Sequence, residues 1–134
     1  MDLDLINYKL LDICELTDKE RLIICKSLSL LTNSEIEKVC KEVIFISSNK
    51  YTNAWRLELK YIKSLKCMIF LSHHLDKYSK KKKMRIILHE VGHHLLKHKS
   101  PIYENLSSEE TAKQEKEANK FANKLINKIT FPES

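Results

Sequence analysis

The chain lacks the long hydrophobic runs of a membrane protein. No apolar stretch approaches the roughly 20 residues that a membrane-spanning helix requires. The acidic start, MDLDL, also lacks the basic region and the cleavage site of a signal peptide. With 43% hydrophobic and 31% charged residues among 134, the composition is that of a soluble globular protein. We therefore expect a cytoplasmic protein that does not bind a membrane.

Spaced cysteine motifs, internal repeats and linkers are also missing. The four cysteines show no C-x-x-C spacing and have apolar neighbours, which predicts reduced core residues rather than disulfides or metal ligands: Cys14, Cys25, Cys40 and Cys67. Because no low-complexity segment divides the chain, we expect residues 1–134 to form one domain, large enough to bury a core without disulfides.

Positive charge is concentrated in one short run. The formal net charge of +6 comes partly from Lys80 to Lys83 and Arg85. Such a run is usually a solvated face, and attraction of an acidic partner or of nucleic acid is the alternative. Since no aromatic residues are interleaved with the lysines, we expect no specific nucleic-acid binding.

The first third of the chain reads as helices. A capping box at residues 17–20 opens a helix that runs to about residue 31, and a second box at residues 34–37 opens a shorter helix to about residue 41. An earlier helix is expected around residues 5–13, with weaker capping signals.

A small sheet and two more helices follow. Three short segments rich in branched and aromatic residues predict strands at 43–47, 55–59 and 67–72. Alternation of apolar and polar residues gives the middle segment one wet face. Helical spacing then runs from residue 80 to about 99, and a capping box at 107–110 opens a last helix to about 129. The predicted fold class is α+β, with a helical part at 1–42 and the three-stranded sheet and two site helices at 43–134.

The stretch HEVGHHLLKH, residues 89–98, holds four of the six histidines and the only glycine. At about 100° per residue, His89 and His93 lie about 40° apart on the helix, with Glu90 on the same side and the apolar stripe opposite. Two imidazoles one turn apart can bind one zinc ion, and the carboxylate after the first histidine can act on the attacking water. A zinc site explains this HExxH pattern better than chance spacing does. Glu90 is therefore the candidate catalytic base.

A catalytic zinc site needs a third protein ligand, and the last helix offers two. Glu115 projects about 50° from the centre of the apolar stripe, whereas Glu117 lies about 110° away, toward solvent. A glutamate at the edge of a buried face needs a partner, so we assign the third ligand to Glu115. Asn119, one turn later, either hydrogen-bonds a ligand histidine or is a plain surface residue.

The remaining histidines and the glycine have other expected roles. His94 and His98 also form a pair four residues apart, but no glutamate follows His94 and no carboxylate of the last helix is left for them, so they are interpreted as structural. His73 and His74 either line the cleft or lie on the surface. Gly92 costs about 1 kcal/mol relative to alanine within a helix, which suggests that another backbone, that of the last helix, comes close.

The segments HEVGHHLLKH and EKEANKFA make the chain resemble the ImmA/IrrE family of zinc metallopeptidases. The pattern of that family is HExxH with glycine at the fourth position, then a glutamate three residues before Ala-Asn or Ala-Asp, followed by Phe-Ala. The matching positions are His89, Glu90, Gly92, His93, Glu115, Ala118, Asn119, Phe121 and Ala122. The match covers about residues 86–125.

This resemblance implies a gluzincin-type, site-specific intracellular endopeptidase with one Zn²⁺, of phage or mobile-element origin, that cleaves a helix-turn-helix repressor. Glu90 would take the proton of the attacking water and pass it to the leaving amine. The substrate would extend along the outer strand, which we assign to residues 67–72. Tyr103 and His94 are the candidate donors to the oxyanion. The alternative is a zinc-stabilised anti-repressor that binds without cleaving, although a structural site needs no base at Glu90.

Overall fold

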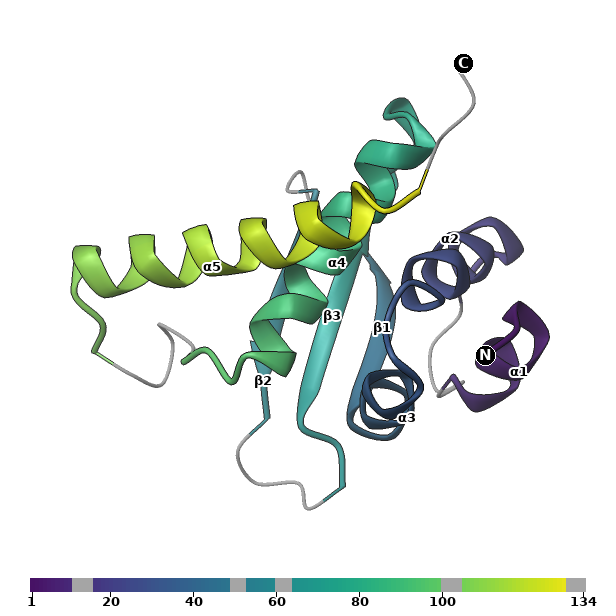
Figure 1. The fold of residues 1–134 in the computed structure, drawn as a ribbon, viewed down its shortest axis with the longest axis horizontal. Helices are drawn as coiled ribbons and strands as arrows, with labels where there is room; N and C mark the ends of the chain where they lie inside the picture. Colours follow the sequence, from purple (N-terminus) through teal and green to yellow (C-terminus); the bar gives the residue numbers. More distant parts are fainter. Residues whose placement is uncertain (11–15, 49–52, 60–63, 100–104, 130–134) are drawn as a thin grey trace.

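A computed structural model describes residues 1–10, 16–48, 53–59, 64–99 and 105–129. The helices precede and follow a small sheet, as the sequence predicts for an α+β protein (Figure 1). In chain order the elements are α1 (Leu3–Lys9), α2 (Asp18–Leu28), α3 (Asn33–Glu42), β1 (Val43–Ser48), β2 (Ala54–Glu58), β3 (Cys67–Ser72), the 3₁₀ helix η1 (His73–Lys77), α4 (Lys80–Leu95) and α5 (Ser108–Ile126). No helix within these ranges is long and apolar enough to cross a membrane.

The capping box predicted for α2 is present, with the Thr17 hydroxyl accepting from the amide of Glu20. The box predicted at residues 34–37 is wrong, because α3 begins two residues earlier. Thr32 is its N-cap, and its amide donates to the Glu35 carboxylate at 2.9 Å. The earlier start puts the buried residues Leu31 and Ile36 at the two positions of a hydrophobic staple, where the predicted box would have put polar side chains.

The first helix is also shorter than predicted, since α1 ends at Lys9 and residues 11–15 are outside the described ranges. Its N-cap is Asp2, whose carboxylate accepts from the amide of Leu5 at 2.8 Å. α2 ends at Leu28, three residues before the predicted end, and α3 continues to Glu42, directly before the first strand.

The three predicted strands form one mixed sheet in the order β1-β3-β2. β1 pairs with β3 in parallel, and β2 pairs with β3 antiparallel. The assignment of residues 67–72 to the outer strand is therefore wrong, because β3 is central and β2 lies at an edge. Burial explains this order, since Cys67, Ile69 and Leu71 are fully buried along β3 whereas all of β2 is half-buried.

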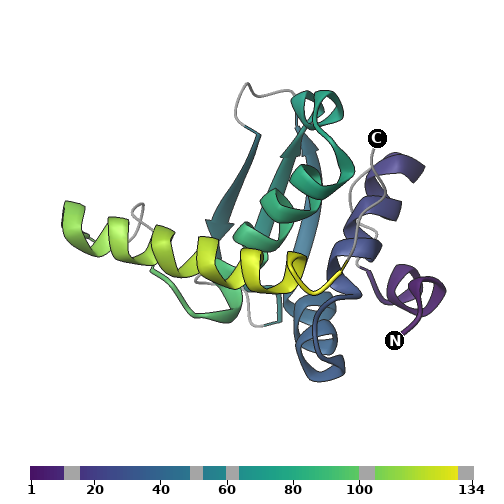
Figure 2. The ribbon, with the colours of Figure 1, turned by 45° about the horizontal axis from the view of Figure 1, so that its top comes forward.

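α4 lies between the sheet and α5, and it contacts both (Figures 1 and 2). Its buried side chains continue the core that β3 begins: Met84, Ile87, Leu88 and Val91. The helix that carries the HExxH motif is thus held on two sides, which fixes the direction of its remaining side chains.

Three of the four cysteines, Cys25, Cys40 and Cys67, are buried free thiols, as predicted; Cys14 lies outside the described ranges. Burial raises the pKa of Cys67 to about 12 and that of Cys40 to about 11. These thiols pack as small apolar groups, and their protonated state makes them poor nucleophiles.

The polar face of β2 is directed to α4 rather than to open solvent. Arg56 is opposite Ile69 in the antiparallel register, so it shares the face of the sheet that α4 covers. On the opposite face the rings of Trp55 and Phe70 stack, with their centroids 3.8 Å apart. The alternation predicted for this strand is present, but its polar side lines a hollow between the strand and the helices.

Candidate metal centre

The helix that carries the candidate site begins at a clear cap and ends in a turn. The Ser79 hydroxyl accepts from the amide of Lys82 at 3.3 Å. At the other end Lys97 has a φ of 57°, and the amide of His98 donates to the carbonyl of His93 at 3.0 Å. This is a Schellman motif, so α4 stops at Leu95 instead of continuing to about residue 99 as predicted.

The candidate ligands converge on one point. The Nε2 atoms of His89 and His93 are 3.1 Å apart. The two oxygens of Glu115 divide between them, with Oε2 3.0 Å from His89 and Oε1 2.9 Å from His93. Within the described ranges, this trio is the cluster whose donor atoms could hold a metal ion, all within 4.8 Å of one another.

The close approach of α5 to α4 occurs at Gly92. A Cβ atom there would lie 2.8 Å from Cδ1 of Phe121, and Ala118 and Ala122 are fully buried on the same helix. The sequence predicted that Gly92 admits the backbone of α5, whereas the neighbour is the Phe121 ring. Because that ring can sit against α4, α5 approaches closely enough for Glu115 to reach both histidines.

The electrostatics of the cluster suit metal binding. Burial lowers the pKa of His93 to about 4, and the neighbouring His89 adds to the effect. Near neutral pH the ring is therefore uncharged, which is the form that binds metals. Burial also raises the pKa of Glu90, although His89 and Arg56 oppose the shift. A carboxylate with a raised pKa is a stronger base, as a general base requires.

A hollow of about 200 Å³ opens beside these residues. It is lined by the edge strand β2, the HExxH face of α4, Lys99 after the end of α4, and the N-terminal half of α5: Ala54, Trp55, Arg56, His89, Glu90, His93, Lys99, Thr111, Gln114 and Glu115. Sequence reasoning missed Arg56. The only signal for Arg56 was its place among the polar residues that alternate with apolar ones along β2. That polar side was interpreted as a solvent-exposed face.

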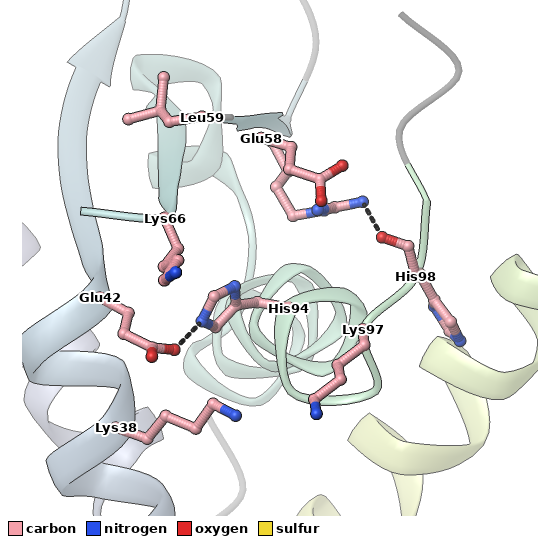
Figure 3. Close-up of a pocket in the computed structure, with 9 residues that line it drawn as sticks. Lys38, Glu42, Glu58, Leu59, Lys66, His94, Lys97 and His98 are labelled. Atoms are coloured by element: carbon pink, nitrogen blue, oxygen red, sulfur yellow. Dashed lines mark hydrogen bonds and ion pairs between the residues drawn. The ribbon is translucent and has the colours of Figure 1, made fainter. Parts of the chain in front are cut away.

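A larger hollow of about 500 Å³ does not contain the cluster. His94 lines it and pairs with Glu42 of α3 at 3.0 Å, which removes His94 from the candidate donors to the oxyanion (Figure 3). In the same view the ring of His98 lies on the other side of α4, toward α5. Arg56 lines both hollows, and its guanidinium donates to the carbonyl of His98 at 3.5 Å.

The structure corrects the roles expected for Glu117 and His98. Glu117 does not simply face solvent, because its Oε2 lies 2.9 Å from Nε2 of His98. Nδ1 of His98 lies 2.8 Å from Nδ1 of His93. A carboxylate of the last helix is therefore available to the second histidine pair, contrary to the prediction.

Other predicted site residues lie elsewhere. Asn119 is exposed, and no hydrogen bond joins it to a histidine in the described part of the chain. Tyr103 lies outside the described ranges. His73 is exposed, with Nε2 3.4 Å from the Ser47 hydroxyl, and neither it nor His74 lines the hollow at the cluster.

The donor set fits zinc. Bonds of about 2.0–2.2 Å from a tetrahedral zinc ion place neighbouring ligand atoms about 3.3 Å apart. The separations of 2.9 to 3.1 Å in the cluster need only a slight expansion to reach this value. Two imidazoles and one carboxylate are also the kind of ligand set that catalytic zinc sites use, and all three residues line the same hollow as Glu90.

An HExxH helix and a glutamate from a second helix offer two histidines and one carboxylate, the ligand set of catalytic zinc sites in several peptidases. Residues 38–131 match the family model of the IrrE N-terminal-like domain, Peptidase_M78. Because the match covers most of the chain, this protein belongs to that family of zinc metallopeptidases. The comparisons with curated proteins and with solved structures find no match.

Proposed function

We propose that this protein is a zinc-dependent, site-specific endopeptidase whose substrate is a helix-turn-helix transcriptional repressor. The observation that carries the proposal is the convergence of His89, His93 and Glu115, with Glu90 lining the same hollow. Membership of a metallopeptidase family supports the reaction class. The choice of a repressor as the substrate rests on the resemblance to the ImmA/IrrE family alone.

In this proposal His89, His93 and Glu115 hold the metal. A zinc ion bound by three protein groups supplies Lewis acidity toward water and toward the carbonyl of the scissile peptide bond. Glu90 accepts the proton of the attacking water and transfers it to the amine that leaves. Its raised pKa suits both steps, because the group must first gain a proton and then release it.

The substrate is expected to extend along β2 rather than along β3. β2 is an edge strand that lines the hollow, so a peptide added beside it passes the metal ligands. Main-chain hydrogen bonds to a strand edge hold an extended peptide with little dependence on its sequence. Arg56, from the same strand, is the donor that we assign to the substrate carbonyl in place of His94, and Tyr103 stays a prediction.

The test compares the wild-type protein with Glu90→Gln, each incubated with the repressor encoded beside its gene. We expect the wild type to cut one peptide bond, detected by mass spectrometry of the fragments. Glu90→Gln should lose on the order of 10²–10⁴-fold in rate while keeping its metal, because the amide preserves the shape but accepts no proton.

Each contrary outcome identifies a different error. Equal cleavage by both proteins would show that Glu90 is not the base. A wild type without zinc would remove the metal centre from the proposal. Zinc-loaded protein that binds the repressor and leaves it whole would favour the anti-repressor that acts by binding.

A further inference from the structure

A chain of hydrogen bonds leads away from the candidate metal centre. Glu117 of α5 contacts Nε2 of His98 at 2.9 Å, and Nδ1 of His98 contacts Nδ1 of His93 at 2.8 Å. The side chain of His98 is only 6% exposed. Both contacts have the length of good hydrogen bonds, and they end on the ring nitrogen of His93 that is not directed at Glu115.

Local backbone structure holds His98 in this place. In a continued helix the side chain five residues after His93 would point about 140° away from it. The Schellman turn at Lys97 reverses the chain and returns His98 to the last turn of α4. Gln114 of α5 then fixes the segment, because its side-chain amide exchanges hydrogen bonds of 2.8 and 3.1 Å with the backbone of Lys99.

The proton positions in this chain follow from the role of His93 as a metal ligand in the proposed function. A neutral histidine that binds a metal through Nε2 carries its proton on Nδ1, so Nδ1 of His93 donates to Nδ1 of His98. Nδ1 of His98 is then an acceptor, and its Nε2 carries the proton that is donated to Glu117.

We propose that His98 and Glu117 are positioning residues that hold His93 in its Nδ1–H tautomer and so present its Nε2 to the metal. The inference rests on the metal site of the proposed function. Partners of this kind orient ligand histidines and raise their basicity, and losing one typically costs 10–100-fold in metal affinity.

A comparison with the other candidate ligand histidine agrees with the proposal. His89 provides a contrast, because its Nδ1 is buried without a hydrogen-bond partner in the described part of the chain. The chain of hydrogen bonds is thus specific to one of the two candidate ligand histidines.

The first test measures zinc affinity by competition with a chromogenic chelator. His98→Leu keeps bulk but removes the acceptor, and we expect zinc to bind 10–100-fold more weakly. His98→Asn should recover most of the loss, because its side-chain oxygen can accept from Nδ1 of His93. His94→Leu is the matched control, since the ring of His94 also pairs with a carboxylate, whereas the ring of His93 is hydrogen-bonded to His89 and His98. The zinc affinity of this control should stay within about twofold of wild type.

The second test observes the tautomer directly. In zinc-loaded, ¹⁵N-labelled protein, long-range ¹H–¹⁵N spectra of the imidazoles should show a slowly exchanging Nδ1 proton on His93, lost in His98→Leu and restored in His98→Asn. Thermal unfolding of each variant identifies any that fails to fold, and the wild-type spectrum remains informative in that case.

The outcomes separate this inference from the proposed function. A wild type that holds no zinc overturns both. A wild type with one zinc per chain and unchanged affinity in His98→Leu overturns only the role of His98. Weaker binding in His98→Leu that His98→Asn does not recover, or an Nε2 proton on His93, shows that His98 acts by packing and also overturns it.

Discussion

Two histidine pairs with the same four-residue spacing within residues 89–98 have different surroundings. His89 and His93 direct their Nε2 atoms at one point, where Glu115 meets both. His94 and His98 diverge, since His94 pairs with Glu42 of α3 and His98 with Glu117 of α5 (Figure 3). This comparison shows that a four-residue spacing is compatible with a metal site but is not sufficient for one. The two histidines must also converge with a shared carboxylate.

The end of α4 explains the divergence. Both members of the first pair lie within the helix, so their side chains are one turn apart on one face. The second pair spans the Schellman turn, which removes His98 from the helical path. His98 therefore contacts the first pair instead of completing its own.

The largest expected effect is a difference in zinc affinity between variants of the two glutamates of α5, Glu115 and Glu117. Glu115→Ala removes a proposed metal ligand, so we expect zinc affinity to fall by more than about 100-fold, beyond the range for an outer partner. Glu117→Ala removes only the end of the hydrogen-bonded chain and should cost about 10-fold. Elemental analysis and chelator competition measure both. Full metal retention in Glu115→Ala with loss in Glu117→Ala would reverse the ligand assignment.

A second comparison concerns the contribution that His94, in the second histidine pair, makes to the free energy of unfolding. His94→Ala should lower the free energy of unfolding by about 1.5–3 kcal/mol, because it breaks a hydrogen bond to a charged group and leaves Glu42 without this partner. Urea denaturation of the metal-free protein measures the change. Zinc stoichiometry should remain one per chain, and its loss would mean that the two pairs are not separate.

The helix crossing that brings Glu115 to the first pair can be altered at Gly92. Gly92→Ala gains about 1 kcal/mol of helix propensity but forces the new Cβ against Phe121, and overpacking costs about 1–3 kcal/mol. We expect a net loss of about 1 kcal/mol in unfolding free energy. In a Phe121→Leu background the same change should cost less, and an equal cost in both would exclude the Phe121 contact as the cause.

The smallest effect concerns the turn that positions His98. Lys97 adopts a left-handed conformation that favours glycine, so Lys97→Gly should stabilise the protein by about 0.5–1 kcal/mol. Lys97→Ala keeps the Cβ atom and should give no such gain. Thermal unfolding compares the two, and stabilisation by alanine alone would assign the effect to the lysine charge rather than to the backbone.

Much of the fold was predictable because its signals are local. The three strands were placed within one residue by their branched and aromatic residues, and the capping signals at Thr17 and Ser107 mark real helix starts. The α3 cap was misplaced because two overlapping capping patterns compete there, and burial of Leu31 decides between them. Strand order could not be predicted, since it depends on pairing between segments that are distant in the chain.

The candidate site, like the fold, was predictable from the sequence only in part. The projection of α5 placed Glu115 at the edge of the buried face, but its side chain is 53% exposed, more than the 44% of Glu117. Glu115 nevertheless contacts both histidines of the HExxH motif. The same projection sent Glu117 to solvent, because it had no means of showing that the chain reverses after α4 and returns His98 to meet it. Arg56 was missed because its partners belong to another element.

The sequence by itself determined the helix that carries His89, Glu90 and His93 on one side, because helical periodicity is a property of neighbouring residues. It also determined the α+β class, because a run of helical patterns is followed by a run of strand patterns and then by two more helices. Only the tertiary structure decided which strand borders the hollow, which glutamate meets which histidine, and where His98 lies. These depend on how α4, α5 and the sheet pack together, and packing joins residues that no local pattern relates.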